Sequence, residues 1–162
     1  MAVLKINDTG KGMEALDFYG SYPTLGVSAG QLMEAVYSDA NPLPQEVREA
    51  VRMRIAVIND CLVCRGARLM PQLGEAFYAN VAAFREHPEL YSPAQRAAME
   101  FTELFAQDHL AIGDEHFSRL RQFFDEGQIA ALTISVGYFL AFGRLTRVLL
   151  LDHACLLKPA AA

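Results

Sequence analysis

The length, composition and charge of the chain exclude several classes of protein. With 162 residues, 52% of them hydrophobic and 20% charged, the chain can bury a core without disulfide staples and is too apolar to be intrinsically disordered. Its net charge of −5 and its scattered lysine and arginine residues argue against a nucleic-acid partner, because phosphate binding needs a concentrated basic surface. We expect one domain over residues 1–162.

The chain shows no pattern of a secretory signal or of a membrane span. No apolar core followed by small residues occurs after Met1. The longest uncharged apolar stretch, Ile129–Gly143, has 15 residues, whereas crossing a bilayer takes about 20. We therefore expect a cytoplasmic protein without a membrane partner. In that reducing compartment the three cysteines are expected to be thiols or redox groups rather than fixed structural disulfides.

Turn residues and apolar spacing predict helices in the first half of the chain. Residues 1–25 are rich in Gly and Asp and are expected to be irregular, with a short helix over 29–37. After Pro42 and Pro44, apolar residues recur at spacings of three and four, which predicts a helix with one buried face. These residues are Val47, Val51, Ile55 and Ile58. Asn59-Asp60 interrupts this helix, and Asp60 is expected to cap another that starts at Cys61.

The second half of the chain carries further helix-start signals and no sustained strand alternation. Phe77, Val81 and Phe84 indicate one helix. Three later starts are expected at Ser92-Pro93-Ala94-Gln95, at Asp114 and at Asp125 with Gln128. The helix from Asp125 is expected to run to Leu151, and its 129–142 part is apolar on nearly every face. We therefore predict a compact all-α domain whose last helix is covered by a homo-oligomer interface, or else is the core helix of a monomer.

The most informative feature is the C-x-x-C pair of Cys61 and Cys64. At the start of a helix these residues lie one turn apart, where unpaired backbone N–H groups and the helix dipole favour a thiolate. Arg65 adjoins Cys64, and Arg68 lies four residues farther on, within reach of it. Nearby cations lower the pKa of a thiol and so activate it. We interpret the pair as a redox-active dithiol.

Two other interpretations of the cysteines stay open at this point. Cys61 and Cys64 could be inert small hydrophobes in a core. They could also supply half of a zinc shell completed by His153 and Cys155, although ligands two apart on a helix point in different directions. We expect neither a metal nor a cofactor. Cys155 is most simply interpreted as a core residue.

At these residues the chain resembles the carboxymuconolactone decarboxylase superfamily, on its alkylhydroperoxidase D-like side. That family carries a Glu, eleven residues, C-x-x-C, three residues and then a His. Glu49 stands twelve residues before Cys61, as the pattern requires, and Cys61 and Cys64 match the cysteines.

The flanking segments extend the resemblance to about residues 40–152. Three segments resemble the family's helices before the cysteines, after them and at the end of the fold: 47–56, 90–105 and 142–149. The chain departs from the family at its two histidines, because Arg68 and Val63 occupy those positions.

The resemblance implies an antioxidant thiol peroxidase in a trimeric or hexameric helical assembly, acting on a peroxide or on a protein or lipoyl disulfide. It assigns Cys64 to peroxide attack, Cys61 to resolution, and Glu49 with the missing His to proton transfer. Arg68 cannot shuttle a proton, because its guanidinium stays charged. It can hold Cys64 as a thiolate and pair with Glu49, so we predict a Glu49–Arg68 salt bridge across a hairpin folded at Asn59.

Two further functions remain alternatives. One is lactone decarboxylation, the activity that names the superfamily. The resemblance implies that members with this activity do not need the cysteine pair. A non-catalytic helical oligomer, whose cysteines sense redox state or do nothing, would show two thiols with unperturbed pKa values near 8.5.

Overall fold

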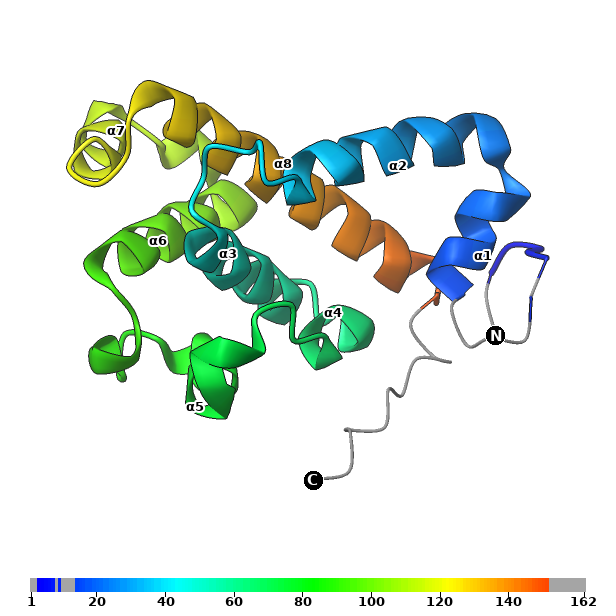
Figure 1. Cartoon of the computed structure of the whole chain (residues 1–162), viewed down its shortest axis with the longest axis horizontal. Coiled ribbons are helices and arrows are strands. Elements are labelled where there is room, and N and C mark those ends of the chain that lie inside the picture. Colours follow the sequence, from blue (N-terminus) through cyan, green and yellow to red (C-terminus); the bar gives the residue numbers. More distant parts are fainter. Residues whose placement is uncertain (1–2, 8, 10–13, 152–162) are drawn as a thin grey trace.

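The computed structural model describes residues 3–7, 9 and 14–151, and all regular structure in these residues is helical (Figure 1). The α-helices are α1 (Glu14–Ser21), α2 (Pro23–Tyr37), α3 (Gln45–Ile58), α4 (Leu62–Gly66), α5 (Gly74–Ala79), α6 (Pro93–Gln107), α7 (Asp114–Leu120) and α8 (Glu126–Val148). Short 3-10 turns occupy Pro71–Leu73, Val81–Ala83, Pro88–Leu90 and His109–Ala111. The all-α prediction is confirmed.

Helix α3 lies at the centre of the fold, between α6 and α8 on one side and α5 on the other (Figure 1). The predicted apolar face is confirmed: Val47, Val51 and Ile55 are buried in the main core. The opposite face of α3 carries Ala50 and Met53 into a second cluster, formed with the segment over 77–91. Because α3 is covered on both sides, three of its charged residues, Arg48, Glu49 and Arg52, are buried as well.

The predicted helix break at Asn59-Asp60 is confirmed. Asp60 has a φ of 49°, in the left-handed region that ends helices. The Asn59 amide donates to the carbonyl oxygens of Phe139 (3.4 Å) and Leu140 (3.2 Å), which fixes the break against α8. One detail of the prediction was wrong, because Cys61 rather than Asp60 is the N-cap of the next helix.

Other helix starts follow the sequence signals closely. Reciprocal capping boxes form at Ser92 with Gln95 and at Asp125 with Gln128. Gly113, not Asp114, precedes α7, because Asp114 is already in the first helical turn. The residues expected in one helix around Phe77 are divided between α5 and the 3-10 turn at Val81–Ala83.

The expectation of an irregular segment over residues 1–25 was wrong for residues 14–25, whereas the described residues 3–7 and 9 carry no regular structure, as expected. Helix α1 lies there, and α2 begins at Pro23, whose fixed φ suits a first helical turn. Gly26 lets the two helices pack closely, because a Cβ at that position would collide with the carbonyl oxygen of Tyr19. The α1–α2 hairpin packs beside the C-terminal half of α8 (Figure 1).

Helix α8 is longer than its uncharged stretch and ends at Val148 rather than Leu151. With 23 residues it is long and apolar enough to cross a membrane. Length and composition do not distinguish such a helix from the core helix of a soluble protein. In this fold it packs against α2, α3 and α6. The described part of α8 still exposes apolar side chains, including Ile134.

Candidate redox site

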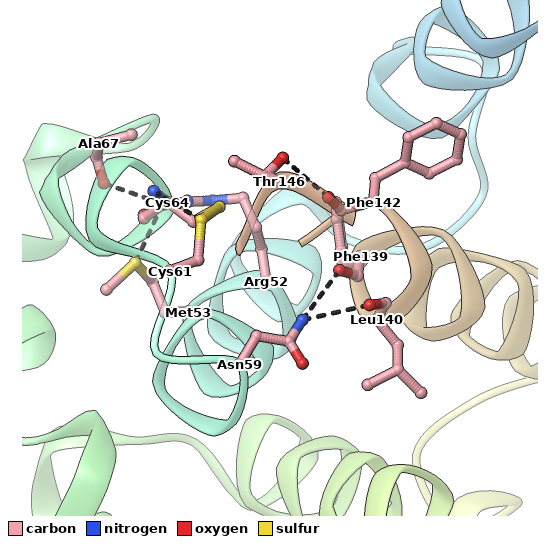
Figure 2. Close-up of a disulfide and its surroundings, with 10 residues drawn as sticks. All are labelled: Arg52, Met53, Asn59, Cys61, Cys64, Ala67, Phe139, Leu140, Phe142 and Thr146. Carbon is pink, nitrogen blue, oxygen red and sulfur yellow. Dashed lines mark hydrogen bonds between the residues drawn. A yellow bond between two sulfur atoms is a disulfide. The ribbon is translucent and has the colours of Figure 1, made fainter. Parts of the chain in front are cut away.

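Cys61 and Cys64 form a disulfide, with their Cα atoms 5.3 Å apart (Figure 2). Cys61 caps the N-terminus of α4, and its Sγ accepts a hydrogen bond of 3.3 Å from the backbone N–H of Cys64. Because one helical turn separates the two residues, the pair can close with little backbone movement. The bond agrees with the interpretation of a redox-active pair.

The two sulfur atoms differ in access. Cys61 is completely buried, with 0% exposure, whereas Cys64 is half-buried and lines a cavity. Figure 2 shows the disulfide facing the part of α8 that carries Phe142 and Thr146. A small molecule in this cavity would therefore meet Cys64 before Cys61.

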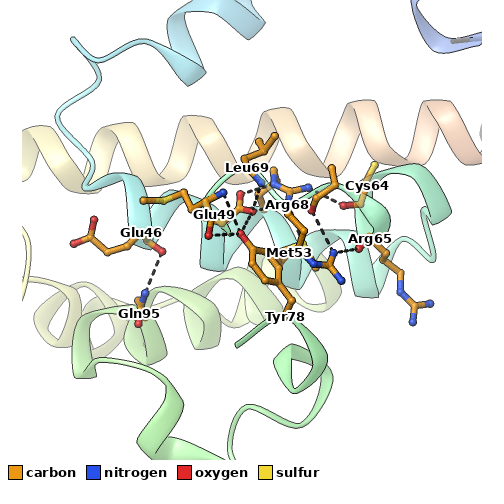
Figure 3. A network of polar contacts seen from close by, with 12 residues as sticks. Glu46, Glu49, Met53, Cys64, Arg65, Arg68, Leu69, Tyr78 and Gln95 are labelled. Atoms are coloured by element: carbon orange, nitrogen blue, oxygen red, sulfur yellow. Dashed lines mark hydrogen bonds and ion pairs between the residues drawn. The ribbon is translucent and has the colours of Figure 1, made fainter. Parts of the chain in front are cut away.

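A buried ion pair on α3 is bonded to the segment over residues 62–69, which comprises α4 with Cys64 and the residues after it. Figure 3 shows the carboxylate of this pair, Glu49, with Leu69 and Tyr78. The Arg52 guanidinium binds both oxygens of the Glu49 carboxylate, at 2.6 Å to Oε2 and 2.7 Å to Oε1. It also donates to the carbonyl oxygens of Cys64 (2.7 Å) and Ala67 (2.9 Å). Both charged side chains are almost inaccessible, so these bonds are made in a low-dielectric setting where they are strong.

The Glu49 carboxylate has further donors, one on the 62–69 segment and one on α5. The backbone N–H of Leu69 donates to its Oε1 at 3.2 Å, and the Tyr78 hydroxyl donates to the same oxygen at 2.8 Å. The Tyr78 oxygen also accepts from the N–H of Met70. Burial and the hydrogen bond to Glu49 raise the pKa of Tyr78 to about 12, so this hydroxyl stays protonated.

The predicted Glu49–Arg68 salt bridge was wrong. Arg68 instead pairs with Glu75, with 3.0 Å between Nε and Oε1, and its guanidinium lies 4.4 Å from the centre of the Tyr78 ring. The hairpin itself was predicted correctly, since the N–H of Leu69 reaches Glu49. Arg52 takes the carboxylate because it lies one turn away on the same helix, a spacing visible in the sequence.

The cavity beside Cys64 has a volume of about 250 Å³ and lies between α1, α2, α3, α4 and α8. Five aromatic residues line it: Tyr19, Tyr37, Tyr138, Phe139 and Phe142. Sequence reasoning missed this cavity, because its walls combine the consecutive helices α1 to α4 with the distant α8, and no local spacing reports their meeting. The contribution of α1 was missed with that helix.

No metal cluster of three or more His, Cys, Asp or Glu side chains occurs among residues 3–7, 9 and 14–151. His153 and Cys155, which the zinc alternative would require, lie outside the described residues, as does the expected core position of Cys155.

No family model matches the chain. The uncharacterized protein YdfG of Bacillus subtilis is 25% identical over 116 residues, which cover 68% of this chain and 78% of that protein. This likeness is below the level that would place the chain in a family.

Three solved structures have a similar fold. A peroxidase-related protein from Silicibacter sp. TM1040 is 20% identical, with a TM-score of 0.70 over 83% of this chain and 73% of that one. A protein of unknown function from Agrobacterium tumefaciens, considered a candidate antioxidant defence protein AhpD, is 18% identical, with a TM-score of 0.72 over 90% and 95%. The debrominase Bmp8, as a cysteine-to-alanine variant bound to 2,3,4-tribromopyrrole, is 17% identical, with a TM-score of 0.69 over 95% of both chains. The chain therefore has an AhpD-like, all-α fold that carries a C-x-x-C disulfide.

Proposed function

We propose that this protein is a thiol-dependent oxidoreductase that cycles Cys61 and Cys64 between dithiol and disulfide while reducing a hydroperoxide. One observation carries the proposal: the pair is bonded, and only Cys64 of the two cysteines borders a cavity able to admit a small molecule. The AhpD-like fold, found also in a peroxidase-related protein, supports it.

The proposed reaction begins with the reduced pair. The Cys64 thiolate attacks the terminal oxygen of the hydroperoxide, the O–O bond breaks, and the alkoxide takes a proton and leaves as the alcohol. Cys64 is then a sulfenic acid, and the Cys61 sulfur attacks it, forming the disulfide and releasing water. An external dithiol reduces the disulfide and restores both thiols. One hydroperoxide and two thiols thus give one alcohol, one water and one disulfide.

We propose that Glu49 helps to hold the 62–69 segment in place and does not transfer a proton. Both of its oxygens already accept hydrogen bonds from Arg52, which has no neutral form at working pH. Arg68 supports the same segment from the outside, through the carbonyl oxygen of Arg65 and the carboxylate of Glu75. Because neither Glu49 nor Arg68 is available to transfer a proton to the alkoxide, we expect slow turnover.

The test is consumption of cumene hydroperoxide with dithiothreitol as reductant. Wild type is expected to turn over, and Cys64→Ser to fall to the rate of reductant alone. After removal of dithiothreitol, reduced Cys61→Ser is expected to consume one equivalent of hydroperoxide and stop as a sulfenic acid, which dimedone would trap. Cys155→Ser, which removes the cysteine outside the motif, is the matched control and is expected to keep full activity. Equal rates for wild type and Cys64→Ser would refute the proposal.

We further propose that the protein acts as a homo-oligomer. A groove of about 430 Å³ between α2 and α8 is lined by Leu32 and Ile134, whose exposed fractions are 39% and 57%. Covering such side chains would gain about 25 cal/mol per Å² of apolar surface. Light scattering is expected to show a trimer or hexamer for wild type. The double variant Leu32→Asp/Ile134→Asp is expected to form a smaller species. Leu110→Asp, at an exposed site on another segment, is the control; a wild-type monomer would overturn the proposal.

A further inference from the structure

We infer that the cavity beside Cys64 binds a compact, uncharged aromatic molecule through stacking and tyrosine hydrogen bonds. The inference rests on the proposed function only in treating Cys64 as the group that meets the ligand. It states which class of ligand the cavity binds: a small ring compound rather than a charged metabolite or the disulfide of a partner protein.

The size of the cavity sets the first limit. Its volume of about 250 Å³ exceeds the ~150 Å³ of a cavity that holds benzene, and it falls just short of the ~300–1,000 Å³ typical of ligand pockets. One six-membered ring with a short substituent fits this space. A polypeptide segment of several residues does not.

The aromatic walls set the second limit. The rings of Tyr138 and Phe142 have centroids 4.6 Å apart, Tyr19 and Phe142 lie at 6.1 Å, and Tyr37 and Tyr138 at 6.4 Å. These separations are those of offset and edge-to-face aromatic pairs, and all four rings belong to residues that line the cavity. A ligand ring among them would extend the same packing, which a linear aliphatic chain cannot do.

The charge balance of the cavity excludes ions. Of the lining residues that the structure describes, Arg52 alone is charged, and its guanidinium is bound to both oxygens of Glu49. A carboxylate ligand would therefore have to compete with Glu49 for the guanidinium of Arg52. It would lose hydration without a free cation to replace it, which disfavours binding.

Three hydroxyl groups supply the polar contacts. Within the part of the chain that the structure describes, the hydroxyls of Tyr19, Tyr37 and Tyr138 form no hydrogen bond, whereas those of Tyr78 and Tyr91 do. Burial raises the pKa of all three cavity tyrosines, so they are neutral O–H groups at physiological pH. They can donate to, or accept from, one or two oxygen atoms on a neutral ligand.

The experiment is a calorimetric titration of the disulfide form with 2-phenyl-2-propanol, the alcohol that reduction of cumene hydroperoxide would release. Saturable binding with one site is expected. The double variant Tyr37→Phe/Tyr138→Phe keeps both rings and removes two hydroxyls, so its Kd should rise about tenfold. Benzoate, a charged ring of similar size, should bind at least tenfold more weakly than the alcohol.

Tyr22→Phe is the matched control, because it removes a hydroxyl in the same α1–α2 region. The Tyr22 hydroxyl donates to the carbonyl oxygen of Lys5, and Tyr22 does not line the cavity. Its Kd should equal that of wild type. Absence of saturable binding, an unchanged Kd in the double variant, or equal binding of benzoate would overturn the inference. Because binding is measured without turnover, a protein that binds the alcohol but consumes no hydroperoxide refutes only the proposed function.

Discussion

Glu49 and Arg52 form a buried, bidentate ion pair one turn apart on α3, and the same guanidinium donates to the carbonyl oxygens of Cys64 and Ala67. The pair thus ties the central helix to the 62–69 segment, which carries the accessible cysteine on α4. A buried ion pair of this kind costs desolvation and is expected to hold a geometry more than to add stability. Its loss should therefore affect both the fold and the position of Cys64.

Arg52→Met is expected to lower the free energy of unfolding by about 3–5 kcal/mol, because it leaves the Glu49 carboxylate buried without a counter-ion. Urea denaturation measures the change. Arg65→Met is the matched control, since its ion pair with Asp60 is solvent-exposed and such pairs contribute about 0–1 kcal/mol. Equal effects of the two substitutions would show that the Glu49–Arg52 pair does not organise the 62–69 segment.

The stability of the protein should fall in strongly alkaline solution through Tyr78. Its pKa is raised from 10.0 to about 12 by burial and by the hydrogen bond to Glu49, so the folded state keeps a proton that the unfolded state loses. The stabilisation is therefore complete below pH 10 and disappears as the pH rises through 12. The slope of unfolding free energy against pH in this range, measured by urea denaturation at a series of pH values, should be smaller in Tyr78→Phe than in wild type, and equal slopes would contradict the prediction.

Local signals predicted much of this fold. The spacing of Val47, Val51 and Ile55 places one face of α3 in the core, and the capping boxes at Ser92 and Asp125 fix two helix starts. These predictions succeeded because each depends on residues within about one helical turn. Helix α1 was missed because the Gly- and Asp-rich composition around it favours turns, whereas its stability comes from packing against α2 and α8.

The site was only partly predictable for a related reason. The C-x-x-C spacing alone located the disulfide, but the partner of Glu49 depended on which of two arginines reaches it. Arg52 lies at i+3 on the same helix and is buried with it, whereas Arg68 leaves the hairpin on its outer side and meets Glu75. The cavity depends on the meeting of five helices, which no local pattern encodes.

Reduced Cys64 should be modified by iodoacetamide much faster than reduced Cys61. Cys64 borders the cavity, whereas Cys61 has no exposed surface, so its alkylation requires local opening. A ratio of at least tenfold is expected, measured by mass spectrometry of peptides after a short pulse of reagent. Faster labelling of Cys61 would reverse the proposed roles of attacking and resolving thiol.

Two glycines of α2 should respond to alanine in opposite directions. An alanine at Gly30 has open space around its Cβ and should stabilise the helix by about 0.5–1 kcal/mol, through the lower backbone entropy of the unfolded chain. An alanine at Gly26 would meet the Tyr19 carbonyl and push α1 away, so we expect destabilisation of about 1–3 kcal/mol. Because Tyr19 lines the cavity, Gly26→Ala should also weaken binding of 2-phenyl-2-propanol, while Gly30→Ala leaves it unchanged. Stabilisation by both substitutions would contradict the close packing of α1 on α2.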